Sequence, residues 1–216
     1  MIGGAPTAAV LACAALTVGC AASTTDYQSL WTTSSTAKPD EDPVPIGIYL
    51  ERKGVTAQPV TPQSLTGLTV SIPTPKGWSR RKNPKLPPTT EVISKGGAEL
   101  PTAVLSVLRL DGDFDPAEAV KHGTADIGIE FNRLDASTDD FHGFPSAMIQ
   151  GSHDMGGQRL HSWYRMVIPT GPPPASQRYL VELSVITLAE KAAEQAPDVE
   201  SIINGFTVAD KQPAPR

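Results

Sequence analysis

The sequence predicts an α+β fold in which helices flank an antiparallel β-sheet, as in an α/β/α sandwich. Alternating apolar and polar runs recur along the chain and predict half-buried strands. They are joined by hairpin-compatible links such as Gly156-Gly157 and the loop Gly171-Pro172-Pro173-Pro174, which favour antiparallel pairing. With 216 residues, 39% of them hydrophobic, the chain can form one domain of ordinary size but not a large two-domain enzyme.

The first predicted element is a short helix from Pro45 to Gly54. Proline suits the first turn of a helix and glycine suits the position after its end. Between them, Ile46, Tyr49 and Leu50 share one apolar face.

Six runs predict strands. The last of them is the clearest, because Val181 and Leu183 alternate with Glu182 and Ser184 as in a strand with one buried face. The six runs are Leu68 to Ile72, Thr89 to Ser94, Thr102 to Leu110, Phe144 to Gln150, Arg159 to Ile168 and Arg178 to Ile186.

A second helix is predicted to begin at Asp115, which has the character of an N-cap and precedes a proline. Its inner stripe of Ala117, Val120, Thr124 and Ile127 predicts that the helix extends to Ile127.

A third helix is predicted from Thr187, whose spacing to Glu190 resembles a capping box, to about Ala196. Pro197 is expected to interrupt or restart it. Beyond this proline, an apolar face recurs at helical spacing at Val199, Ile202, Ile203 and Phe206.

The N-terminus has the pattern of a lipoprotein signal peptide. Residues 1–25 carry no charged side chain, and the apolar run ends at Leu16-Thr17-Val18-Gly19-Cys20, which looks like a lipobox. Gly19 would admit the peptidase and the Cys20 thiol would receive diacylglycerol. This predicts a signal peptide over 1–19 and export to the outer face of the cell membrane. The alternatives are an uncleaved anchor, a conventional secretory signal and a chance alanine-rich tail.

The signal region also lacks the usual Lys or Arg, which leads us to expect a start upstream of Met1. After lipidation, residues 20–43 are expected to form a tether, because nine of the fifteen residues from Ser23 to Ala37 are Ser or Thr. The folded domain is expected over 44–209, followed by a disordered tail over 210–216.

Several function classes are disfavoured by composition. The net charge of −5 argues against a nucleic-acid binder, which needs a basic face. Both cysteines lie in the first 20 residues, so the domain has neither a disulfide nor a cysteine-based metal site. No cofactor is expected.

Catalytic and metal sites are not predicted either. Ser152-His153-Asp154 holds the residue types of a hydrolase triad, but neighbours on a strand point to opposite faces. The spacing of His142, His153 and His161 matches no zinc pattern. The protein is therefore expected to be non-enzymatic.

A basic cluster surrounds Trp78, with five Lys or Arg residues between Lys76 and Lys85. Such a loop could contact anionic headgroups, and its candidate contacts are Lys76, Trp78, Arg80 and Arg81. The alternative is a solvated loop.

A groove between the sheet and a helix is a second candidate site. Phe131, Trp163, Tyr164 and Met166 could line it and bind an amphiphile. Core packing is the alternative role for each of them.

Besides the lipobox and the Thr-rich tether, the chain contains the motifs Ile48-Tyr49-Leu50, Gly54-Val55, Pro73-Thr74-Pro75-Lys76-Gly77-Trp78 and Ile202-Ile203-Asn204-Gly205-Phe206. Together these features resemble the mycobacterial LpqN/LpqT lipoprotein family, and the resemblance covers roughly residues 44–208. The family is similar in fold to PsbP-like proteins. The resemblance implies a non-enzymatic envelope lipoprotein linked to lipid trafficking and host interaction, and it carries over Cys20 as the one functional residue.

Two functions are thus predicted. The first is a membrane-anchored protein that binds an amphiphilic lipid or glycolipid, in partnership with a membrane transporter. The alternative is a module that docks envelope or host proteins through a sheet edge or loop.

Overall fold

The computed structural model describes residues 44–125, 127 and 131–211. The predicted signal peptide, Cys20 and the tether lie outside the described residues, as do the last five residues of the predicted tail.

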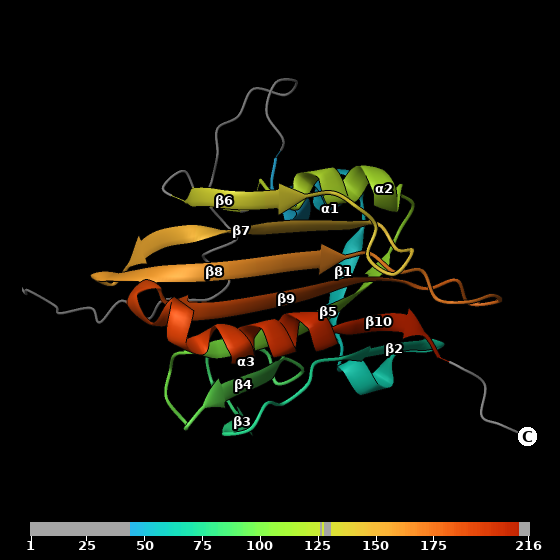
Figure 1. Cartoon of the computed structure of the whole chain (residues 1–216). Helices are drawn as coiled ribbons and strands as arrows, with labels where there is room; N and C mark the ends of the chain where they lie inside the picture. Colours follow the sequence, from blue (N-terminus) through green and yellow to red (C-terminus); the bar gives the residue numbers. More distant parts are fainter. Residues whose placement is uncertain (1–43, 126, 128–130, 212–216) are drawn as a thin grey trace, which may run out of the picture.

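The middle layer is an antiparallel sheet with strand order β3-β4-β5-β9-β8-β7-β6 (Figure 1). An eighth strand, β1, pairs with β5 beside β4. The strands are β1 (Thr56–Pro59), β3 (Trp78–Arg81), β4 (Glu91–Lys95), β5 (Thr102–Asp111), β6 (Asn132–Ser137), β7 (Ser146–Met155), β8 (Gln158–Val167) and β9 (Arg178–Leu188).

One face of this sheet, here called the α3 face, is covered by α3 (Ala192–Gly205) together with the two-stranded sheet of β2 (Leu68–Ser71) and β10 (Thr207–Asp210). Ile202, Phe206 and Val208 are fully buried against Leu105 and Leu183 of the sheet in one apolar cluster. Burial of each such side chain contributes about 1.5–3 kcal/mol, which holds this layer in place.

The opposite face, here called the α1 face, carries α1 (Ile46–Arg52), α2 (Pro116–Ala119) and the 3₁₀ turn η3 (Val120–His122). Ile46 and Leu50 of α1 pack with Ala147, Met166 and Leu180 of the sheet in a second cluster. The predicted α+β class, with an antiparallel sheet between helices, is therefore confirmed.

The six predicted strands are present with shifted ends, and α1 matches the first predicted helix. The turn at Gly156-Gly157 joins β7 to β8 with φ values of 58° and 77°, which glycine adopts without strain. β1, β3, β6 and β10 were not predicted. In β1 and β6 nearly every residue is exposed, so no apolar alternation marks them.

The second helix begins as predicted but is shorter. The Asp115 carboxylate accepts a hydrogen bond from the Ala117 N–H at 2.9 Å. The helical turns end at His122, so the prediction that they reach Ile127 is wrong. Gly123 still has helical backbone angles, with φ −65° and ψ −22°, but glycine has a low helix propensity and the regular turns do not continue past it.

The third helix was misplaced in the prediction. Thr187 and Leu188 belong to β9, and α3 starts only at Ala192. It continues through Pro197, where one backbone hydrogen bond is lost. Burial of Ile202 in the last turn outweighs that loss.

The predicted basic loop around Trp78 is wrong, because Trp78–Arg81 form β3. Trp78 is only 6% exposed and belongs to the cluster on the α3 face. Its indole Nε1–H donates to Asp198 Oδ2 at 3.1 Å, and Lys95 Nζ donates to the same oxygen at 2.8 Å. These bonds, that of Lys95 first, lower the pKa of the Asp198 carboxyl and fasten α3 to the β3–β4 edge.

Replacing Asp198 with alanine should lower the free energy of unfolding by about 1 kcal/mol, because the Trp78 indole loses its acceptor. The pKa of Asp198 is lowered, so its stabilisation is present above the ordinary value of 3.8 and is lost as the pH falls below that value. Urea unfolding of Asp198→Ala and of Glu200→Ala, an exposed acid on the same helix, tests this. Equal stability of the two variants at pH 7 would contradict it.

Candidate functional site

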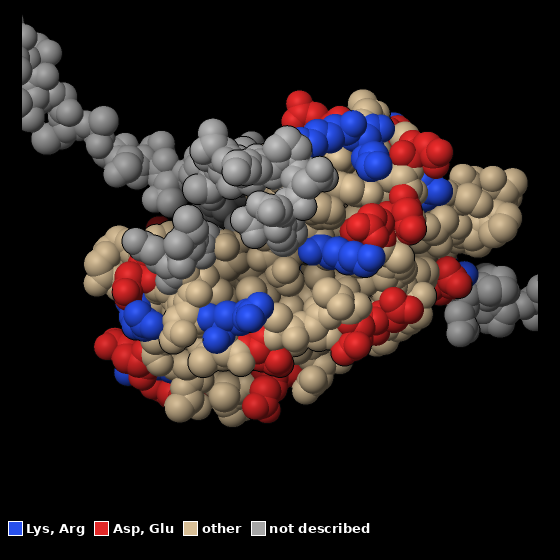
Figure 2. All heavy atoms as spheres, turned by 90° about the horizontal axis from the view of Figure 1, so that it is seen from above, with Lys and Arg blue, Asp and Glu red and all other residues tan. Residues whose placement is uncertain are grey.

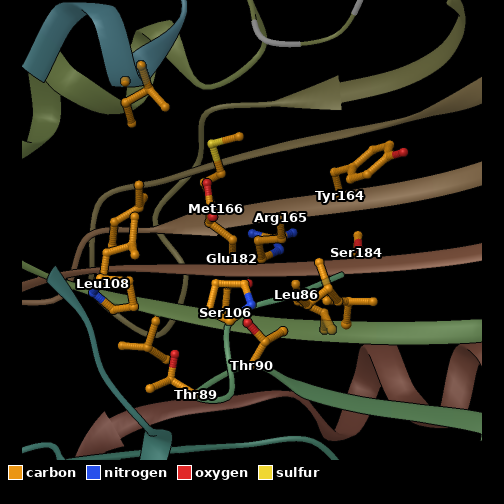
Figure 3. Close-up of a pocket in the computed structure, with 18 of the residues that line it drawn as sticks. Leu86, Thr89, Thr90, Ser106, Leu108, Tyr164, Arg165, Met166, Glu182 and Ser184 are labelled. Atoms are coloured by element: carbon orange, nitrogen blue, oxygen red, sulfur yellow. The ribbon is translucent and has the colours of Figure 1, made fainter. Parts of the chain in front are cut away.

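A pocket of about 450 Å³ lies on the α1 face of the sheet (Figure 3). Its walls come from α1, from the centre of β5, β8 and β9, and from the segment between β3 and β4. The apolar residues that line it from α1, from the α1 face of the sheet and from the β3–β4 segment are Ile46, Ile48, Pro59, Leu86, Pro87, Val104, Leu108, Met166 and Leu180.

The pocket lies where the sheet changes partners. β1 pairs with β5 from Leu108 onward, whereas β4 pairs with it only up to Leu105. Along β5, Ser106 therefore lies between the stretch that pairs with β4 and the stretch that pairs with β1. The segment Leu86–Thr90 comes from the β3–β4 connection and forms a wall on this side.

The floor is made of residues in register on three adjacent strands. Glu182 of β9 pairs with Ser106 on one side and with Met166 on the other. The next row holds Ser184, which pairs with Val104 of β5 and with Tyr164 of β8. Because alternate residues share a face, these side chains all point to the α1 side of the sheet. Figure 3 shows Glu182 between Met166 and Ser106.

Glu182 is the one charged residue on this floor. Within the described part of the chain it has neither a hydrogen bond nor an ion pair to its carboxyl group. Burial raises the pKa of Glu182 to about 7. Alternation along the strand places Glu182 on its polar face, but the sequence did not indicate a site there. The available signal was a single acid among the apolar residues at the centre of a strand.

The pocket contains two of the four predicted amphiphile-binding residues. Tyr164 and Met166 line it. Trp163 points to the α3 face, where it is buried in the other cluster, so its predicted place in the groove is wrong. Phe131 lies near Tyr164, with ring centroids 6.3 Å apart, but packs over Gly151 rather than in the lining.

The predicted headgroup contacts do not form one surface. Trp78 is buried, and Arg80 pairs with Glu91. Arg81 follows Arg80 on a strand and therefore points to the other face. Lys76 is exposed, and its contact with a headgroup stays a prediction. On the side shown in Figure 2, acidic and basic side chains are interspersed.

The hydrolase and zinc hypotheses find no support in the geometry. Arg159 donates to Ser152 Oγ at 2.9 Å and to Asp154 Oδ2 at 3.1 Å, while His153, between them on β7, points to the other face. His161 pairs with Ser152 and so also lies opposite His153. In the described ranges, no three His, Cys, Asp or Glu residues are grouped as metal ligands.

None of the helices in the described residues is both long and apolar enough to span a bilayer.

Replacing Glu182 with glutamine should remove a pH dependence of stability. The pKa is raised in the folded state, from 4.5 to about 7, so the stability linked to this proton is full below 4.5 and is lost as the pH rises through about 7. Between pH 4.5 and 9, the free energy of unfolding of wild type should fall by about 3 kcal/mol more than that of Glu182→Gln.

Chemical denaturation across this pH range measures the difference, with Glu200→Gln on the exposed side of α3 as the matched control. Parallel stability curves for wild type and Glu182→Gln would contradict the assignment.

Comparison with known proteins places the chain in a family. The family model described as "Probable lipoprotein LpqN" matches residues 42–209. "Putative lipoprotein LpqT" of Mycobacterium tuberculosis (strain ATCC 25618 / H37Rv) is 54% identical over 209 residues, which cover 94% of this chain and 92% of that protein. The protein of the same name from Mycobacterium leprae (strain TN) is 51% identical over 209 residues, which cover 94% of this chain and 95% of that protein.

A solved structure shares the fold. The crystal structure of LpqN from Mycobacterium tuberculosis superposes with a TM-score of 0.64 at 18% identity, covering 78% of this chain and 99% of that chain. None of these names is that of an enzyme. The sequence resemblance is confirmed, and the chain belongs to the LpqN family of lipoproteins.

Proposed function

We propose that this protein binds an amphiphilic lipid or glycolipid in the pocket on the α1 face and makes or breaks no bond in it. The observation that carries the proposal is the lining, in which apolar side chains surround a few polar groups. Such a volume and composition are typical of small-molecule sites.

The membership in a lipoprotein family supports the place of action. Cys20 would carry the lipid anchor, and the domain would then lie on the outer face of the cell membrane. LpqN, whose fold this chain shares, is described as involved in cell envelope biogenesis. The ligand would thus be an envelope lipid, passed to or from a membrane transporter.

The pocket offers separate surfaces to the two parts of an amphiphile. Leu86 and Pro87 on one side and Ile46 of α1 on the other can contact an alkyl chain. Thr89 and Thr90, which also line the pocket, supply hydroxyl groups to a polar part. Release of water from the apolar walls would drive binding.

Docking of an envelope or host protein is the second candidate, and one feature favours it. β6 ends the order of the large sheet, where it pairs with β7 alone among the described strands. Leu134 on β6 is 63% exposed. An extended peptide could add to this edge. Loss of a cross-linked partner in Leu134→Asp, with lipid binding unchanged, would favour this function over the first.

Filling the pocket should abolish binding. Ser106→Phe would place an aromatic ring on the floor, whereas Thr69→Phe would place it on an exposed position of β2. Because both apolar clusters and the pocket are built from residues 44–211, the unlipidated chain from Ala21 suits the assay. Titration with the neutral probe N-phenyl-1-naphthylamine should give a fluorescence rise in wild type and Thr69→Phe but none in Ser106→Phe.

Mass spectrometry of lipid extracted from the purified wild-type chain gives an independent readout. Absence of both co-purified lipid and probe binding would refute the proposed function.

Replacing Cys20 with serine should prevent anchoring, because serine lacks the thiol that receives the lipid. Wild type should be labelled by an alkyne fatty acid and should sediment with membranes. Cys20→Ser should be unlabelled and should leave the membrane fraction, whereas Cys13→Ser should behave as wild type. Labelling of Cys20→Ser would show that the lipidated residue is another one.

A further inference from the structure

The position of Glu182 bears on which polar groups a ligand in the pocket can carry. The residue lies on a central strand of the sheet, and its neighbours in register are Ser106 and Met166. A carboxyl group held there without a partner is costly, since a buried charge is normally paired or hydrogen-bonded. A ligand that supplies a hydrogen-bond donor would satisfy it.

The charged and titratable groups around the pocket add no positive charge to its interior. α1 contributes Glu51, a second acid, and β8 contributes Tyr164. The β3–β4 segment contributes Leu86, Pro87, Thr89 and Thr90, and β5 contributes Ser106 and apolar residues.

Arg165 also borders the pocket through its place on β8, but it precedes Met166 on the strand, so its guanidinium group points to the α3 face. There it sits 4.6 Å from the centre of the Phe141 ring and 5.5 Å from that of Trp163, and it donates to Ser146 Oγ at 3.1 Å. The charged side chains that the lining presents on the α1 side of the sheet are thus Glu182 and Glu51, and both are acidic.

We infer that Glu182 is a specificity-determining residue: the pocket accepts an amphiphile whose polar group donates hydrogen bonds and has no negative charge, and it excludes carboxylate or phosphate amphiphiles. This inference rests on the proposed function and deepens it. A ligand hydroxyl or ammonium group can donate to the Glu182 carboxylate, and such charge-assisted bonds are stronger than neutral ones. An anionic group would meet a like charge in a poorly solvated site.

The selectivity should depend on pH. Burial raises the pKa of Glu182 to about 7, so the acid is ionised well above this pH and protonated below it. Exclusion of anions is then strongest in alkaline solution and weakens as the pH falls, because a protonated Glu182 can itself donate to an anionic oxygen.

Three probes of equal chain length test the inference: 1-decanol, decylammonium and decanoate. Their displacement of N-phenyl-1-naphthylamine from the unlipidated chain is measured at about pH 8.5 and pH 6, on either side of the pKa of Glu182. At the higher pH, decanol and decylammonium should bind about ten-fold or more tightly than decanoate. At the lower pH the ratio of decanol to decanoate should fall several-fold.

Glu182→Gln keeps the size of the side chain and its ability to accept a hydrogen bond, but removes the charge. In this variant decanoate should gain affinity, the preference for decylammonium should disappear, and the pH dependence should be lost. Glu200→Gln removes the same charge from the far side of the sheet and should leave all three affinities as in wild type.

The possible results distinguish a failure of the proposed selectivity from a failure of the proposed binding function. Equal affinity of wild type for decanol and decanoate at both pH values would overturn the selectivity and leave the proposed pocket intact. The same holds if Glu182→Gln retains the wild-type preference. Absence of binding of all three probes and of the naphthylamine would overturn the proposed function, and the selectivity with it.

Discussion

The structure depends on the burial of both faces of its central sheet. A strand sends successive side chains to opposite faces, so each of the long strands contributes to two apolar clusters at once. In β9, Val181 and Leu183 join α3 on one side, while Leu180 packs with α1 and α2 on the other. The sheet therefore cannot slip by one residue without exposing both clusters, and its register is fixed. In the described part of the chain no cysteine is present to assist, so packing carries the stability.

The two faces are covered unequally, and the pocket follows from this difference. On the α3 face a long helix and a two-stranded sheet cover the apolar residues, and Asp198 fastens that helix to Trp78 and Lys95. On the α1 face the helices are short. The change of partner along β5 from β1 to β4 adds to the opening beside them. A fully paired edge would place strand atoms there. The space of the pocket thus comes in part from this interruption of pairing, and the β3–β4 segment closes it on one side.

Polar groups on the floor of the pocket are a cost to folding that a ligand could offset. Ser106, Ser184 and Glu182 occupy positions where apolar residues would pack better, and they face the pocket. Natural proteins keep such residues most often where function requires them. Strand alternation separates the triad and zinc candidates at Ser152 and His153, so these residues do not form one site together.

The sequence by itself determined the fold class, most strands, the start of α2 at Asp115 and the family, because alternation, capping and motifs are local properties of the chain. Strand alternation would have placed Trp163 opposite Tyr164 and Met166, but the sequence could not tell which face carries the pocket. It could not place Trp78 in the core either, since that depends on which layer covers β3. Nor could it find β6, whose residues are exposed, or continue α3 through Pro197, where distant packing outweighs a local break. The pocket and the isolation of Glu182 were decided by the tertiary structure alone, because they arise where β1, β4, α1 and β9 meet.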